Sequence, residues 1–286
     1  MTPERKALVV VGLAIVVVSF AAILIRLCTV PTAVIAAWRL TLASLILLPV
    51  FLATGRGRGL SRGQVAPCIL AGLFLSLHFL LWIESLKLTT VASSVVLVTT
   101  SPIFAAVFGR IFLGEAIGPR TLAAIGCCLV GSLVIGRGDF HVAAATLRGD
   151  LYALGGAAAF GAYFVLGRWL RRTVGFIPYV FAAYSASAVM LLAWAVATRH
   201  QLAGFAPANY LWLFLVALGP QAFGHSSLNW ALGHLPASKV AISVLGEPIG
   251  SALLAWAIFH EVPGLPLLGG GALILYGVYL ALSARA

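Results

Sequence analysis

The chain has 286 residues, of which 62% are hydrophobic and only 9% are charged. So few charged side chains cannot cover the surface of a water-soluble domain of this size, and the composition therefore predicts an integral membrane protein. The formal net charge is +11, but Lys and Arg stand in short segments between apolar runs, which excludes an extended basic face for nucleic acid and fits a positive-inside bias.

Apolar runs long enough to cross a hydrocarbon core of about 30 Å recur along the whole chain. The first follows Arg5 and Lys6, and it is longer than the roughly 7–15 apolar residues of a signal peptide, so we keep it as a span. The sequence predicts an all-α integral membrane protein with ten transmembrane helices, at about 7–25, 33–53, 66–86, 91–113, 119–136, 149–168, 176–197, 210–232, 237–259 and 265–283.

The Lys and Arg residues outside these spans lie mostly on the side of the N-terminus. Because cytoplasmic loops carry the excess of positive charge, we expect both termini in the cytoplasm. The location predicted is the cell (inner) membrane, with the lipid bilayer as a partner and no nucleic acid partner.

The stretch from Leu86 to Glu115 returns as Leu232 to Glu261 at a constant offset of 146, and the proline of the first, Pro102, then coincides with Pro248. This self-similarity predicts two copies of one unit, residues 1–143 and 144–286, with five spans each. An odd number of spans makes the second copy enter the membrane from the opposite side. We therefore expect inverted repeats around a central cavity, an architecture typical of secondary transporters.

Pro102 and Pro248 are expected within helices, where a proline frees the carbonyl four residues earlier, at Val98 and Val244. A freed carbonyl inside a membrane needs a partner or a wet cavity. One interpretation is a pair of hinges that also offer acceptors to a substrate ammonium. The other is a simple kink that neighbouring hydroxyl groups satisfy.

The ninth span carries Lys239, Ser243, Glu247 and Ser251 at steps of four residues, which places them on one side of a helix. Glu247 falls near the middle of the span, where a carboxylate usually faces the interior of a bundle. It can bind a substrate ammonium, carry a coupling proton, or pair with Lys239 or a histidine as a structural element.

The eighth span repeats this pattern with Gln221, His225 and Asn229, and the third span places His78 and Trp82 four residues apart. Polar stripes on different spans indicate a shared wet cavity. The imidazole of His78 can bind a ligand or titrate near neutral pH, or it can serve as an interhelical hydrogen-bond donor.

Arg39 lies about a third of the way into the second span. Its guanidinium can hold a substrate carboxylate through two hydrogen bonds, or it can snorkel outward or bind free carbonyls of a neighbouring helix. The candidate substrate-binding residues are His78, Trp82, Thr100, Ser101, Tyr163, Gln221, His225, Asn229, Ser243 and Glu247.

Enzymatic chemistry finds little support. The four cysteines lack metal-ligand spacing, and we expect no metal and no cofactor. His260-Glu261 is not followed by the second histidine of a zinc-binding helix. An intramembrane enzyme is therefore the weakest reading of function.

The run from Ser85 to Ser93, followed by Ser101-Pro102 and closed by Leu113-Gly114-Glu115, resembles the EamA domain of the drug/metabolite transporter superfamily. The second copy resembles it through Glu247-Pro248, with His260 at the usual glycine. The resemblance implies a carrier with a central cavity, similar to the exporters of amino acids and related metabolites, working on small-molecule substrates by alternating access. A proton-coupled efflux carrier for lipophilic cations is the alternative. The oligomeric state stays open, a monomer included.

Overall fold

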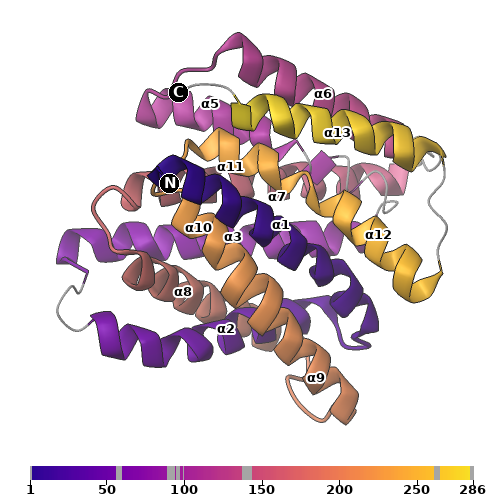
Figure 1. The fold of residues 1–286 in the computed structure, drawn as a ribbon. Helices are drawn as coiled ribbons and strands as arrows, with labels where there is room; N and C mark the ends of the chain where they lie inside the picture. Colours follow the sequence, from indigo (N-terminus) through magenta and orange to yellow (C-terminus); the bar gives the residue numbers. More distant parts are fainter. Residues whose placement is uncertain are drawn as a thin grey trace.

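The computed structural model describes residues 2–55, 60–88, 94, 97–98, 100–136, 144–260 and 265–283, and helix is the regular secondary structure throughout this part of the chain (Figure 1). The helices are α1 (Pro3–Leu27), α2 (Thr32–Gly55), α3 (Arg62–Leu88), α5 (Ser101–Leu113), α6 (Pro119–Gly136), α7 (Ala144–Leu170), α8 (Phe176–Ala197), α9 (Pro207–Val216), the π-helix η1 (Ala217–His225), α10 (Ser226–Ala231), α11 (Ala237–Val244), α12 (Glu247–Phe259) and α13 (Leu265–Ser283).

Six of the described helical segments are long and apolar enough to cross a membrane. They are 3–27, 32–54, 62–85, 147–170, 176–197 and 237–258, and shorter apolar helices occupy 101–113, 119–131 and 268–281. Large apolar side chains cover the perimeter, for example Leu13 (64% exposed) and Phe112 (72% exposed). An outer surface of this kind is suited to lipid rather than to water.

In the second half of the chain, two of the expected continuous helices are interrupted. The eighth span is built from α9, η1 and α10, and the wide turns of η1 contain Pro220. The ninth span breaks at residues 245–246, between α11 and α12. Wide helical turns of this type frequently occur at functional sites, because they re-aim side chains that a regular helix would point elsewhere.

The structure corrects the expectation that Pro102 and Pro248 lie inside helices. Each is the second residue of a helix, with α5 beginning at Ser101 and α12 at Glu247. The first N–H groups of a helix have no intrahelical acceptor, so a proline there loses no hydrogen bond. Each proline therefore starts a helix, and the helix break lies on the N-terminal side of the proline.

The helices recur at the offset found in the sequence. Both α5 and α12 have 13 residues, and the starts of these helices, Ser101 and Glu247, are 146 residues apart. The same difference separates the starts of α6 at Pro119 and α13 at Leu265.

α6 and α13 pack side by side, and the start of α1 and the end of α13 lie at the same end of the molecule (Figure 1). Glycines bring the two helices close. A Cβ added to Gly131 would lie 2.5 Å from the carbonyl oxygen of Gly270, and one added to Gly277 would lie 2.8 Å from that of Ala124. Adding 146 to Gly131 gives Gly277, and subtracting 146 from Gly270 gives Ala124, so the two contacts are equivalent. Because residue numbers rise along α6 where they fall along α13, the helices run antiparallel.

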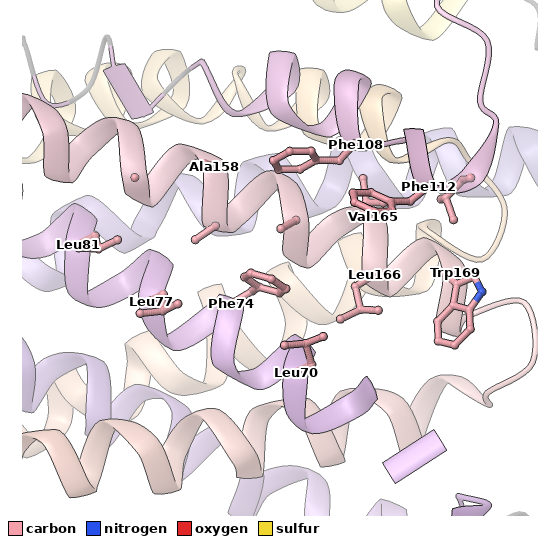
Figure 2. Close-up of a pocket in the computed structure, with 14 residues that line it drawn as sticks. Leu70, Phe74, Leu77, Leu81, Phe108, Phe112, Ala158, Val165, Leu166 and Trp169 are labelled. Carbon is pink, nitrogen blue, oxygen red and sulfur yellow. The ribbon is translucent and has the colours of Figure 1, made fainter. Parts of the chain in front are cut away.

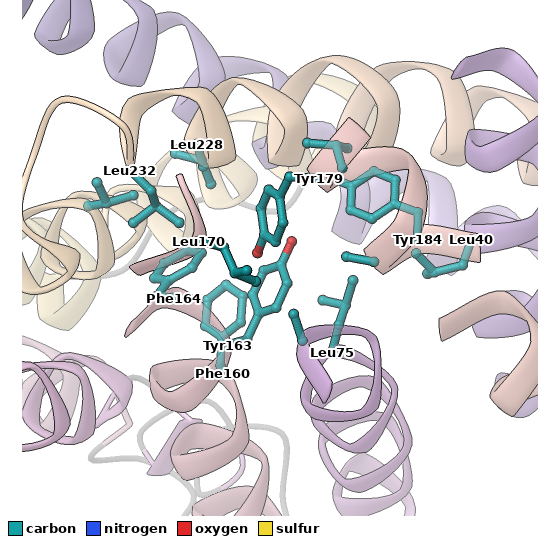
Figure 3. Packing of buried hydrophobic residues seen from close by; sticks show 14 of the residues in the cluster. Leu40, Leu75, Phe160, Tyr163, Phe164, Leu170, Tyr179, Tyr184, Leu228 and Leu232 are labelled. Atoms are coloured by element: carbon teal, nitrogen blue, oxygen red, sulfur yellow. The ribbon is translucent and has the colours of Figure 1, made fainter. Parts of the chain in front are cut away.

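The main core lies between α2, α3, α7, α8 and α10, where large aromatic side chains are fully buried (Figure 3). Tyr163 on α7 and Tyr179 on α8 point their hydroxyl groups toward each other at its centre (Figure 3). A core that contains polar groups in a membrane protein needs internal partners for them. The candidate site is built from these groups.

Candidate functional site

Buried polar side chains gather at the middle of the helix bundle, on helices from both halves of the chain. Arg39 comes from α2, Tyr163 from α7, Tyr184 from α8, Gln221 from η1 and Asn229 from α10. Arg39 is only 3% exposed, so it does not snorkel outward. An intramembrane arginine in the interior of a bundle is costly and usually functional.

Arg39 and Gln221 form the most distinctive pair. Arg39 Nε donates a 2.6 Å hydrogen bond to Gln221 Oε1, and the guanidinium carbon lies 4.6 Å from the ring centre of Phe79. Within the described part of the chain, Arg39 Nη2 and Gln221 Nε2 are buried and have no partner. Because an unpartnered buried N–H is costly, this pair is suited to an additional acceptor such as a carboxylate.

Glu247 supplies the opposite charge. It is the first residue of α12, where the helix dipole favours an anion, and it is close enough to Arg39 for the two charges to attract each other. The hydroxyl of Ser19 on α1 donates to the backbone carbonyl of Glu247 at 3.3 Å. The site thus brings a guanidinium and a carboxyl group into electrostatic reach of each other, the two groups that a zwitterion requires.

A second network is internally satisfied. Tyr163 Oη donates to Asn229 Oδ1 at 2.9 Å, and Asn229 Nδ2 donates to the carbonyl of His225 at 2.9 Å and to Tyr184 Oη at 3.3 Å. Ser226 also reaches Tyr184 Oη, at 3.4 Å. These bonds tie α7, α8 and α10 together, so they hold the shape of the site.

An aromatic wall stands beside both groups. His78 Nδ1 donates to the carbonyl of Gly156 at 3.0 Å, and its ring stacks on Phe160 at 4.3 Å and on Trp82 at 5.9 Å between ring centres. The ring of Phe160 meets His225 edge-on at 6.1 Å. Trp82 Nε1 and His225 Nδ1 are buried without a partner among the described residues, so both can still bind a ligand.

The remaining candidates are bonded locally. The hydroxyl of Thr100 donates to the carbonyl of Leu97 at 2.6 Å, and that of Ser243 to the carbonyl of Lys239 at 2.8 Å. Ser101 is buried at the start of α5. Among the candidates, the structure thus brings together four residues through α8 and η1: Tyr163, Gln221, His225 and Asn229. Thr100 and Ser243 instead form contacts within their own segments.

Several members of the site are absent from the candidates chosen from sequence. From sequence alone Arg39 has three possible roles, while Phe79, Phe160 and Ser226 belong to none of the polar stripes. Only the charge of Arg39 inside an apolar span could have identified it. Phe79 and Phe160 are recognisable only from the packing of α3 and α7, and Ser226 only from its contact with Tyr184 on α8.

Polar contacts close the end of the molecule that holds the N-terminus. Arg168 at the end of α7 lies 3.3 Å from Glu115 Oε1 and donates to the carbonyl of Leu232 at 2.9 Å. Lys239 Nζ is 3.7 Å from Glu4 Oε1. We call the contacts of Arg168 with Glu115 and Leu232 the ionic latch; a cavity of about 470 Å³ lies beside it.

Burial and nearby arginines at this end of the molecule lower the pKa of a histidine. His234, in the turn after α10, has a pKa lowered below its usual value by partial burial and by the charges of Arg171 and Arg168. The lowered pKa favours the neutral form of this imidazole. Glu261, which corresponds to Glu115 in the second copy, lies outside the described residues.

Known proteins resemble the chain in sequence and in fold. The uncharacterized transporter YdfC of Bacillus subtilis is 27% identical over 203 residues, which cover 70% of this chain and 65% of YdfC. An uncharacterized transporter of Archaeoglobus fulgidus is 25% identical over 255 residues, 86% of each chain. One crystal structure superimposes with a TM-score of 0.82 over 97% of this chain and 96% of the other, at 21% identity, which shows a shared fold.

The model of one family matches the chain twice, over residues 6–137 and 147–283, and together these two matches span nearly all of the helices that surround the site. The relatives named above are also described as transporters. The chain belongs to the EamA-like transporter family.

Proposed function

We propose that this protein is a secondary transporter that exports amino acids and related small metabolites by alternating access. The observation that carries the proposal is the buried pair of unpartnered donors, Arg39 Nη2 and Gln221 Nε2, within electrostatic reach of Glu247. An amino acid offers a carboxylate to the donors and an ammonium to the anion. Uncharged metabolites or simple cations match only part of this arrangement.

The side chain of the substrate then lies against the aromatic wall. His78, Trp82 and Phe160 present stacked rings, and rings adapt to varied apolar groups, which suits broad specificity. Tyr163 and Asn229 hold the wall in place through their own hydrogen bond. Thr100, Ser101, His225 and Ser243 complete the proposed lining.

Alternating access rests on the proposed inverted repeats, residues 1–143 and 144–286. The double match of the family model supports two copies. The reciprocal contacts of Gly131 and Gly277 support a twofold axis between α6 and α13, and because these helices are antiparallel, that axis is perpendicular to them. Ten spans with this symmetry allow the halves to exchange inward-open and outward-open shapes, with Pro102 and Pro248 as hinges at the helix breaks.

The ionic latch is proposed as the gate on the cytoplasmic side. It joins Glu115 of the first copy to Arg168 and Leu232 of the second, and Lys239 meets Glu4 at the same end. Breaking these contacts would let the two copies part there. In this proposal both termini face the cytoplasm and the protein lies in the inner membrane.

The test is counterflow in proteoliposomes that contain the purified protein, loaded with a panel of labelled amino acids, with and without a proton gradient. We expect exchange of at least one amino acid, and loss of that exchange in Glu247→Gln. No exchange of any amino acid would refute the proposal. Uptake of a lipophilic cation driven by a pH gradient, without amino-acid exchange, would establish the cation-efflux alternative.

A further inference from the structure

A lateral groove runs along the membrane-facing side of α3, α5 and α7 (Figure 2). It has a volume of about 730 Å³, within the roughly 300–1,000 Å³ that is usual for ligand sites. Its lining is apolar throughout and includes Leu70, Phe74, Phe108, Ala158 and Ala162, with Trp169 at one end. Phe112 and Trp169 are 72% and 45% exposed, so the groove opens toward the surrounding lipid.

Small side chains on α7 make the groove deep. The corresponding groove on α1 and η1, of about 590 Å³, is lined by Val17 and Phe20. Gly161 on α7 lies beside Phe104 on α5, and Gly250 on α12 lies beside Ser19 on α1. Because Gly250 is equivalent to Phe104 at the offset of 146, Ser19 is equivalent to Gly161. α7 therefore corresponds to α1 at an offset of 142. At that offset Ala159 and Ala162 take the places of Val17 and Phe20. The depth of the lateral groove is therefore a property of this half, and the repeated fold does not require it.

The length of the groove suits a lipid chain. Its lining on α7 extends from Gly155 to Trp169, which at about 1.5 Å per residue is roughly 20 Å. One leaflet contributes about 15 Å of a hydrocarbon core of about 30 Å. The groove is therefore longer than one leaflet is thick, and it can hold a single acyl chain from that leaflet over the whole length of the chain.

One end of the groove is basic. α3 begins at Arg62 and α7 is followed by Arg172, and both arginines are exposed. Gln64 Nε2 donates a 3.5 Å hydrogen bond to Thr173 Oγ1, so these two helix ends are adjacent. The contact of Arg168 with Glu115 shows that the ends of α5 and α7 lie together, and Trp169 marks the same end of the groove (Figure 2). Tryptophan is typical of the membrane interface, where phosphate groups of lipids lie.

We propose that the lateral groove binds an acyl chain of an anionic phospholipid, whose phosphate lies against Arg62 and Arg172. Basic residues beside a cleft between transmembrane helices are the chemistry that recognises such headgroups. The apolar lining accounts for the chain, and the arginines account for the preference for an anionic lipid. The same helices carry His78 and Phe160 on other faces, so the lipid packs behind the wall of the candidate site.

The experiment uses the purified full-length protein in bilayers that contain brominated phosphatidylglycerol or brominated phosphatidylcholine. Bromine on the acyl chain quenches tryptophan fluorescence at contact distance, and the difference between wild type and Trp169→Phe isolates Trp169. We expect half-maximal quenching of Trp169 at a several-fold lower mole fraction of the anionic lipid. Equal quenching by both lipids would overturn the proposal.

Two kinds of variant test the two parts of the site. Ala162→Phe fills the groove and should abolish the preferential quenching, as should the double variant Arg62→Gln, Arg172→Gln, which leaves the apolar lining intact. Leu151→Phe, on the exposed face of α7, and Arg5→Gln, at the start of α1, are the matched controls and should keep it.

Each outcome decides the proposal even where a variant is unstable. The charge variant alone suffices if Ala162→Phe does not fold, because surface arginines tolerate substitution. A preference that survives the charge variant contradicts the proposal. A change of oligomeric mass in Ala162→Phe, with quenching of Trp169 independent of lipid, would show that a second copy covers the groove and would also contradict it.

Discussion

The contact between α6 and α13 provides the sharpest test of the duplicated architecture. A Cβ at Gly131 would lie 2.5 Å from the carbonyl oxygen of Gly270 and 2.8 Å from the side chain of Ile274. A Cβ at Gly277 would lie 2.5 Å from Cys128 Sγ and 2.8 Å from the carbonyl oxygen of Ala124. Real Cβ atoms do not approach other atoms so closely, so Gly131→Ala and Gly277→Ala must both push the helices apart.

Two further glycines on these helices are matched controls. Gly126 on α6 and Gly269 on α13 have open space where a Cβ would be added. Alanine in a helix is favoured over glycine by about 0.5–1 kcal/mol, so Gly126→Ala and Gly269→Ala should be neutral or stabilising. Overpacking of a close contact costs about 1–3 kcal/mol. The helix-propensity gain is common to all four variants and cancels when each interface variant is compared with the control on its own helix.

The assay is thermal unfolding of the purified variants in one detergent at one heating rate. With a shift of roughly 2–4 °C per kcal/mol, we expect Tm of each interface variant to lie about 2–12 °C below that of its control. The two interface glycines should behave alike, because their contacts are equivalent. Interface variants as stable as the controls, or a loss confined to one of the two positions, would refute the reasoning.

Two other predictions concern the polar contacts. Tyr163→Phe leaves the buried Oδ1 of Asn229 without its donor, so we expect a loss of about 1–3 kcal/mol in stability, measured as Tm, while substrate affinity changes little; a large loss of affinity at unchanged Tm would contradict this. In a double-mutant cycle of Glu115→Gln and Arg168→Gln, the coupling free energy of the ionic latch should be about 0.5–2 kcal/mol, and additive effects would show that the pair contributes nothing.

The sequence predicts much of the fold because membrane insertion imposes strong rules. Long apolar runs specify helices, and six of the expected spans appear as described helices that are long enough to cross a membrane. A hinge or a kink was expected at Pro248, but the end of one helix at Val244 and the start of another at Glu247 were not, and neither was the π-helix η1. Pro248 and Pro220 mark both places in the sequence, but a periodic pattern of apolar residues does not specify whether a proline starts a helix or lies within wide turns.

The candidate site was predicted in part for a similar physical reason. Gln221 and Asn229 stand out because polar residues at helical spacing are rare in a span, and the structure buries both. The partner of Gln221, Arg39, comes from a helix far away in sequence, so no local pattern could pair them. Phe79 and Phe160 look like any other apolar residue until the packing of α3 places them beside a charge and a histidine.

Binding measurements can show whether Arg39 and Glu247 together select a zwitterion. The affinity of the best amino acid from the counterflow panel should be compared with that of its decarboxylated amine, in wild type and in Arg39→Gln. A hydrogen bond to a charged group contributes about 1.5–3 kcal/mol, so Arg39→Gln should weaken amino-acid binding about 10- to 150-fold.

The amine lacks the carboxylate, and its affinity should change little in the same variant, so that the preference for the amino acid disappears. Arg39→Lys, which retains the charge but not the fork of donors, should give an intermediate preference. If Arg39→Gln binds the amino acid as tightly as wild type, or if the preference over the amine survives, Arg39 does not hold the carboxylate and the account is wrong.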